Sequence, residues 1–176
     1  VCSSDLRRYS LARCPMQRMI WRTAWWTHTP LCRQRTPSAE KIAAAEAGDV
    51  EAWISANGDI PAGACVAMNS GWGAKVGTPE FRNTPDGNFA FPGFATSATD
   101  MLATMNVAAI ASDTLSLDPG NSADFAVHHS WLPGGRYGIE NLANVEQLPA
   151  TGATIFVGAP KHARGTGGPA RVMAVI

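Results

Sequence analysis

The fold and the chemistry of this chain centre on residues 113–142, which read DTLSLDPGNSADFAVHHSWLPGGRYGIENL. The stretch holds an imidazole at His128 and a carboxylate at Glu140, separated by a connection that contains Pro and Gly. A neutral imidazole nitrogen and a carboxylate oxygen suit Zn²⁺ or Mn²⁺, and two such side chains can converge on one ion from different elements. A spacing of twelve positions (140 − 128) is common by chance, so spacing alone favours a structural role for both residues.

Strands and helices alternate along the chain around this stretch. Apolar runs predict buried strands at 64–68 and 107–111, and apolar residues at helical spacing predict a helix at 95–105 between them. This alternation favours an α/β fold with active-site loops at the ends of strands. The other expected elements are helices at 39–47, 49–57 and 122–132, a strand at 137–142 that carries Glu140, and strands at 154–157 and 171–176.

Several short motifs follow one another in this part of the chain: SGW at 70–72, FPG at 91–93, DTLSLD at 113–118, His128, Leu132, ENL at 140–142 and GGPARVMAV at 167–175. In this order they resemble the C-terminal part of the cyclase-like metal-dependent hydrolases. That family includes bacterial kynurenine formamidases and isatin hydrolases. The resemblance extends from about Asp49 to Ile176.

The resemblance implies a swivelling β/β/α architecture with a mixed sheet, incomplete at its N-terminus, in which residues 38–176 form the C-terminal portion of one domain. It also implies that His128 and Glu140 are metal ligands for Zn²⁺ or Mn²⁺. In the family, the remaining ligands and the general-base histidine come from an upstream H-x-G-T-H-x-D-x-P-x-H motif. This motif does not occur in the sequence, so no catalytic residue is assigned.

The reaction that the resemblance implies is amide hydrolysis, as in an arylformamidase that converts N-formylkynurenine to kynurenine and formate in tryptophan catabolism. An isatin-type cyclic amide is the alternative substrate. Because the upstream motif is missing, we expect activity to be impaired, and a non-catalytic fragment of the same fold is a further alternative. The expected partner is a small-molecule amide, and we expect a cytoplasmic homo-oligomer.

Aromatic and polar residues near the proposed ligands are candidates for a substrate pocket. Trp72, Phe91 and Pro92 can form a wall against a planar substrate, although core packing explains them equally well. Residues 113–118 place two aspartates at a strand end, where Asp, Ser and Thr side chains commonly satisfy backbone amides. We therefore predict a turn-making role for them. His129 is expected either at the surface or beside a metal ligand without binding the ion itself.

Residues 1–37 differ from the rest of the chain. They contain seven arginines and half of the six tryptophans, and they sustain neither a strand nor a helix period. The opening VCSSDL is also the translation of a common sequencing-library adapter. We therefore interpret the segment as artefactual or disordered and predict that it contributes no core strand. A basic arm that binds a partner is the alternative, and deletion of the segment would then leave a hydrolase-like core intact.

Composition narrows the classes of protein further. Hydrophobic residues make up 45% and charged residues 16% of the chain, as in a globular domain. The formal net charge is zero, so neither nucleic acid nor an anionic membrane surface is an expected partner. The sequence has no apolar run of about 18 residues that would predict a transmembrane span. Four cysteines without a C-x-x-C pair do not indicate a disulfide scaffold.

Overall fold

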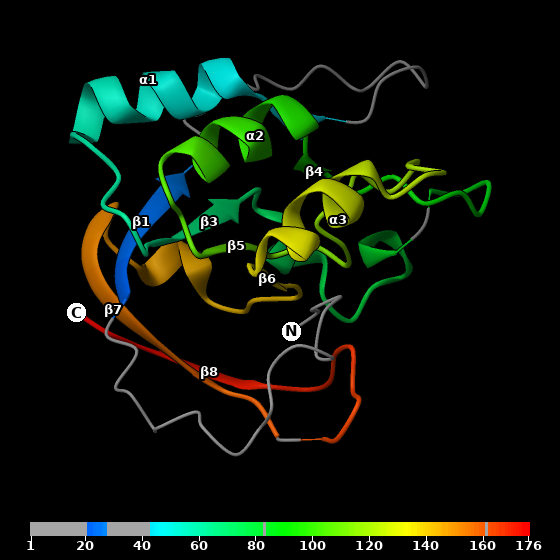
Figure 1. The fold of residues 1–176 in the computed structure, drawn as a ribbon. Coiled ribbons are helices and arrows are strands. Elements are labelled where there is room, and N and C mark those ends of the chain that lie inside the picture. The colour runs from blue at the N-terminus through cyan, green and yellow to red at the C-terminus, as the bar shows by residue number, and fades with distance from the viewer. Residues whose placement is uncertain (1–20, 28–42, 83, 161) are drawn as a thin grey trace.

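The structure is a computed structural model of the chain, and it describes residues 21–27, 43–82, 84–160 and 162–176. Its main sheet is built from β1 (Trp21–Thr27), β3 (Cys65–Asn69), β5 (Ala109–Ser112), β6 (Tyr137–Ile139), β7 (Thr151–Gly158) and β8 (Arg171–Val175). The strand order is β6-β5-β3-β1-β7-β8 (Figure 1). β1, β3, β5 and β6 are parallel to one another, whereas β7 is antiparallel to β1 and β8 to β7.

Three helices cover one face of this sheet (Figure 1): α1 (Ala47–Asn57), α2 (Thr96–Thr104) and α3 (Ala126–Trp131). The side chains of β3 alternate between the two faces, as a strand requires. Val66 and Met68 belong to the core beneath the helices, whereas Cys65 and Ala67 belong to a second buried cluster on the opposite face. The sheet is therefore buried on both sides, which explains why β3 reads as a continuous apolar run.

On the face away from the helices, side chains of β7, β8 and the short helix η5 (Val145–Gln147) pack against the central strands in this second cluster. Ile139, Val145 and Ile155 are buried there, and Leu148 and Val172 pack against them. β8 forms the edge of the sheet and carries exposed apolar side chains, including Met173, which is 55% exposed. The end of β6 and the start of η5 thus lie on the side of the sheet that faces β8.

The predicted α/β fold with a mixed sheet is confirmed. The expected strands at 64–68 and 107–111 correspond to β3 and β5, and the expected helix at 95–105 corresponds to α2. None of the helices within the described ranges is both long enough and apolar enough to span a bilayer.

The expected helix at 39–47 is wrong in its described part. Ala44 and Ala45 form β2 (Ala44–Ala45), which pairs in parallel with β4 (Gly93–Phe94). α1 begins only at Ala47 and continues through Gly48, and the Asp49 carboxylate accepts a hydrogen bond of 2.9 Å from the Glu46 N–H at its start. Alanine propensity is a weak preference that this strand pairing overrides.

The prediction that residues 1–37 contribute no core strand is also wrong. β1 comes from this segment and lies between β3 and β7, paired with both. Alternation fails as a signal here because strands in the interior of a largely parallel sheet need not alternate apolar and polar residues. Deletion of the segment therefore cannot leave the sheet intact. Residues 1–20 and 28–37 lie outside the described ranges.

Candidate functional site

The loop after β5 starts with Asp113, which ties two parallel strands together at their carboxyl ends. Its carboxylate accepts hydrogen bonds from Ser70 N–H (3.1 Å), Ser70 Oγ–H (2.6 Å) and Trp72 N–H (2.8 Å). Asp113 is 3% exposed, so these bonds compensate the burial of its charge. Asp113 therefore has the predicted role of satisfying backbone amides, and it holds the segment after β3 against the segment after β5.

The other end of this loop, Asp118, lies against the first turn of α3. Its carboxylate accepts hydrogen bonds from Val127 N–H (2.7 Å) and His128 N–H (3.1 Å), so it serves the unpaired amides that every helix start leaves. The residue before the helix, Phe125, has φ +51° and provides no side-chain cap. Asp118 caps the helix instead, from eight residues before Ala126. Asp118 thus satisfies backbone amides, as predicted, but its contact with the His128 ring was not predicted.

Asp118, His128 and Glu140 form a continuous row of polar side chains. Asp118 Oδ2 lies 2.5 Å from His128 Nδ1, and His128 Nε2 lies 3.3 Å from Glu140 Oε1. Glu140 Oε1 also accepts a hydrogen bond of 3.2 Å from Leu117 N–H. The side chain of Asp118 is 2% exposed, whereas those of His128 and Glu140 are 18% and 26% exposed. Exposure therefore increases along the row toward Glu140.

The charges in this row stabilise one another. The hydrogen bond to Asp118 is the main cause that raises the pKa of His128 to about 9, and Glu140 adds to it. Burial alone would raise the pKa of Asp118, but hydrogen bonds from the His128 ring and from the amides of Val127 and His128 outweigh it and lower the pKa. The metal-free site thus favours imidazolium between two carboxylates. A metal ion at Nε2 would have to displace this proton.

Close backbone packing holds the loop that carries Asp118. A Cβ added to Gly93 would lie 2.3 Å from the carbonyl carbon of Asp118, and one added to Gly120 would lie 2.8 Å from Ala90 N. Phe94 N–H also donates to Leu117 O at 2.7 Å. Segments 89–94 and 117–120 can approach so closely only because glycine occupies these two positions.

The three residues predicted to form a substrate wall are differently placed. Phe91 is 5% exposed, with its ring centroid 6.0 Å from that of the exposed Phe89. The Trp72 indole donates to Phe81 O at 2.7 Å, and Lys75 Nζ lies 3.5 Å from its ring centroid. Pro92 is partly buried. The Trp72 N–H donates a hydrogen bond to the Asp113 carboxylate, and this bond links Trp72 to the loop that ends at Asp118. A substrate-wall role for the three stays a prediction.

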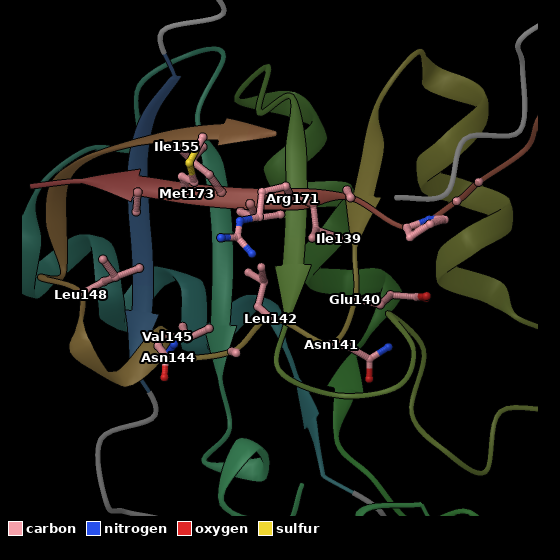
Figure 2. A pocket seen from close by; sticks show the side chains of 17 residues that line it. Ile139, Glu140, Asn141, Leu142, Asn144, Val145, Leu148, Ile155, Arg171 and Met173 are labelled. Atoms are coloured by element: carbon pink, nitrogen blue, oxygen red, sulfur yellow. The ribbon is translucent and has the colours of Figure 1, made fainter. Parts of the chain in front are cut away.

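A cavity of about 930 Å³ borders Glu140 on the side of the sheet that faces β8. Its walls come from the end of β6, the segment before η5, and β8 with the glycines that precede it (Figure 2). Arg171 reaches from β8 toward the middle of the cavity, whereas the Glu140 side chain points away from it (Figure 2). Leu142 and Val145 contribute apolar surface, and Asn141 contributes an amide. Glu140 thus lies between this cavity and His128.

The donor atoms fit a metal site in part. An imidazole nitrogen and a carboxylate oxygen face each other, and the second ring nitrogen is held by a buried carboxylate, as is usual for metal-binding histidines. The ranges that the structure describes contain no group of three His, Cys, Asp or Glu that could hold an ion. The row therefore supplies two ligands of a site that needs at least three protein groups.

Comparison with known proteins places these features in a family. The family model described as "Putative cyclase" matches residues 11–119, which is more than half of the chain. This range includes much of the atypical segment 1–37, and it ends before His128 and Glu140. A relative from Roseibium aggregatum, an isatin hydrolase, is 29% identical over 132 residues. That alignment covers 72% of this chain and 50% of the relative, so the chain spans about half the length of the curated relative it matches.

Solved structures of isatin hydrolases are also similar to this chain. An isatin hydrolase bound to the product analogue thioisatinate superposes with a TM-score of 0.79 at 26% identity, over 91% of this chain and 61% of the other. Isatin hydrolase A from Labrenzia aggregata, bound to benzyl benzoate, gives 0.79 at 27% identity, over 97% and 66%. A potential metal-dependent hydrolase with cyclase activity shares the fold, with a TM-score of 0.65 at 17% identity, over 90% and 66%. The chain belongs to the cyclase family.

Proposed function

We propose that this chain is a metal-dependent hydrolase of cyclic amides, which opens a lactam ring of the isatin type. The isatin hydrolases among its relatives support this substrate class over the N-formylkynurenine that the motifs first suggested. The observation that carries the proposal is the approach of His128 Nε2 to Glu140 Oε1 at 3.3 Å, with the opposite ring nitrogen held by Asp118.

His128 and Glu140 would hold the divalent ion, Zn²⁺ or Mn²⁺, together with ligands from outside the described residues. When bound, such an ion polarises the amide carbonyl and lowers the pKa of a water molecule to near neutrality. The protein's own contribution is to turn Nε2 toward the metal position and to hold the Glu140 carboxylate beside it. The Leu117 amide orients the same carboxylate oxygen through its hydrogen bond of 3.2 Å.

The competing interpretation is a non-catalytic fragment in which the row is only a structural ion pair. One observation favours the ligand role: the second ring nitrogen of His128 is held by the buried carboxylate of Asp118, as is usual for metal-binding histidines. Because the upstream H-x-G-T-H-x-D-x-P-x-H motif does not occur in the sequence, we expect the ion to bind weakly, and activity to rise as the metal concentration is raised.

Turnover of two substrates tests the proposal. Ring opening of isatin and formate release from N-formylkynurenine would be measured for the full chain with increasing Mn²⁺ or Zn²⁺. We expect metal-dependent ring opening to exceed formate release, and His128→Ala and Glu140→Gln to abolish it. Glu146→Gln, an exposed position in η5, should keep full activity. Metal-dependent turnover that survives His128→Ala would overturn the ligand assignment.

A chimera covers the case in which the chain alone turns over neither substrate. It would carry the H-x-G-T-H-x-D motif of an isatin hydrolase relative in the segment between β1 and β2. Gain of metal binding and ring opening together would support the proposal. A chimera that binds metal and still opens no ring would contradict it.

A further inference from the structure

The contacts of Asp118 extend beyond those of a helix cap. One carboxylate receives three N–H groups, from the Val127 amide, the His128 amide and the His128 ring. Only an ionised carboxylate can accept all three, because it has four acceptor sites and no donor. Asp118 therefore selects which ring nitrogen of His128 carries hydrogen.

We infer that Asp118 is a positioning residue, which holds the His128 ring so that Nδ1 carries the hydrogen of the neutral imidazole and Nε2 faces Glu140 as the atom that binds a metal ion. The inference rests on the proposed function for the identity of the ligand. Its structural content, however, is a statement about the metal-free protein. A neutral imidazole has one N–H and one bare nitrogen, and the hydrogen bond made by one nitrogen decides the state of the other. Both carboxylates can only accept, and the shorter contact, 2.5 Å to Asp118 against 3.3 Å to Glu140, assigns the single hydrogen of a neutral ring to Nδ1.

The position of Asp118 is itself tightly determined. It is 1% exposed, and its own amide donates to Ser116 Oγ at 3.2 Å. Gly93 packs so closely that a Cβ there would lie 2.3 Å from the Asp118 carbonyl carbon. Asp118 also accepts hydrogen bonds from the Val127 and His128 amides at the start of α3. The same carboxylate therefore fixes the His128 ring relative to the helix backbone. A rotation of the ring would break a partly buried hydrogen bond of 2.5 Å.

The alternative is that Asp118 is a structural cap and nothing more. The Asp118→Asn variant distinguishes the capping of α3 from the positioning of the His128 ring. The asparagine oxygen can still accept from the Val127 amide, so part of the cap survives. Its NH₂ group, placed toward the ring, would donate to Nδ1 and drive the hydrogen to Nε2, the atom that faces Glu140. Metal binding at Nε2 then requires loss of that hydrogen.

Asp113→Asn provides a matched control. Asp113 is a second buried carboxylate of the same loop, and it also accepts several amide hydrogen bonds. The donors of these bonds belong to residues 70–73 rather than to His128. The Asp113→Asn control should lower stability, because it also removes a buried hydrogen-bond acceptor. It should leave the position of the hydrogen on the His128 ring unchanged.

The test uses the full chain labelled with ¹⁵N-histidine. In the metal-free protein at about pH 10, where the imidazole is neutral, ring ¹⁵N shifts report which nitrogen carries hydrogen. We expect hydrogen on Nδ1 in the wild type and in Asp113→Asn, and on Nε2 in Asp118→Asn. A Zn²⁺ titration followed through the same signals should show a roughly 10- to 100-fold loss of affinity in Asp118→Asn, and less than about 2-fold in Asp113→Asn.

Each outcome decides the inference. Hydrogen on Nε2 of the wild type would overturn it without any variant, so a failure of Asp118→Asn to fold leaves the test complete. Equal losses of Zn²⁺ affinity in both aspartate variants would reduce Asp118 to a structural cap. The ¹⁵N measurement involves neither turnover nor substrate. A chain that opens no ring but keeps hydrogen on Nδ1 therefore refutes the proposed function alone.

Discussion

His128 Nε2 lies 3.3 Å from Glu140 Oε1, although the first residue belongs to helix α3 and the second follows the end of strand β6. A shared metal ion requires its two ligands to approach within a few ångströms, and this distance meets that requirement. The pairing depends on β6, which is placed next to β5 in a parallel register and brings Glu140 to the edge where α3 begins. Their function as metal ligands stays a prediction.

Deletion of residues 1–27 should abolish folding. β1 pairs with β3 over five residues and with β7 over four, so its removal divides the sheet into two parts. We expect no cooperative urea transition by circular dichroism. Deletion of residues 171–176, which removes only the edge strand β8, should lower the transition midpoint and keep the transition cooperative. A cooperative transition in the chain that begins at His28 would show that β1 is dispensable.

Asp113→Ala should lower the free energy of unfolding by about 3 kcal/mol. The substitution leaves the amides of Ser70 and Trp72 without their acceptor in a largely buried position. Urea denaturation at neutral pH measures the difference. Asp59→Ala, at an exposed carboxylate, should change the value by less than about 0.5 kcal/mol. Equal effects of the two substitutions would contradict the role assigned to Asp113.

Gly93→Ala should destabilise the protein by about 3 kcal/mol, because the new methyl group would lie 2.3 Å from backbone atoms of Asp118 and Pro119. Gly48→Ala is the matched substitution, since no atom lies within 4 Å of its added Cβ. Because Gly48 lies inside α1, alanine there should stabilise by about 0.5–1 kcal/mol. Thermal and urea unfolding of both variants provide the comparison. The idea fails if alanine at position 93 is tolerated as well as at position 48.

The stability that His128 contributes should decline at alkaline pH. Folding raises its pKa from 6.5 to about 9, mainly through the hydrogen bond to Asp118, so the folded state holds the proton more tightly. This contribution is complete below about pH 6.5 and is lost as the pH rises through about 9. In chelator-treated samples, the difference in unfolding free energy between wild type and His128→Gln should therefore shrink between about pH 6 and pH 10.

The exposed His162 offers the control for this measurement. His162→Gln should leave the pH profile of wild-type stability unchanged. A difference between wild type and His128→Gln that grows toward alkaline pH would reverse the expected sign and contradict the ion pair.

The sequence predicted those elements whose signal is local. β3 and β5 are short apolar runs, and α2 has apolar residues at helical spacing. The cap of α3 was missed because its acceptor, Asp118, lies outside the helix by eight residues. The available signal was that Phe125, the residue before the helix, has no side-chain oxygen to accept from its first amides. β1 was missed because its partners are distant in sequence and it needs no alternating pattern.

The site was predictable in part for the same reason. His128 and Glu140 were found through short motifs, but the row they form with Asp118 depends on the three-dimensional course of two loops. The close packing of Gly93 against the Asp118 backbone joins residues 25 positions apart (118 − 93), and composition does not encode such an approach. Phe91 was ambiguous between a pocket wall and the core, since an aromatic residue beside Pro-Gly suits both.

The central place of β1 has a consequence for biosynthesis. The ribosome delivers β1 and β3 early, but β7, the second neighbour of β1, starts only 124 residues after Thr27 (151 − 27). At translation rates of about 5–20 residues per second, one edge of β1 stays open for roughly 6 to 25 seconds in the nascent chain. An open strand edge is a template for association between chains. Soluble yield should therefore depend on chaperone capacity and on ribosome density along the message.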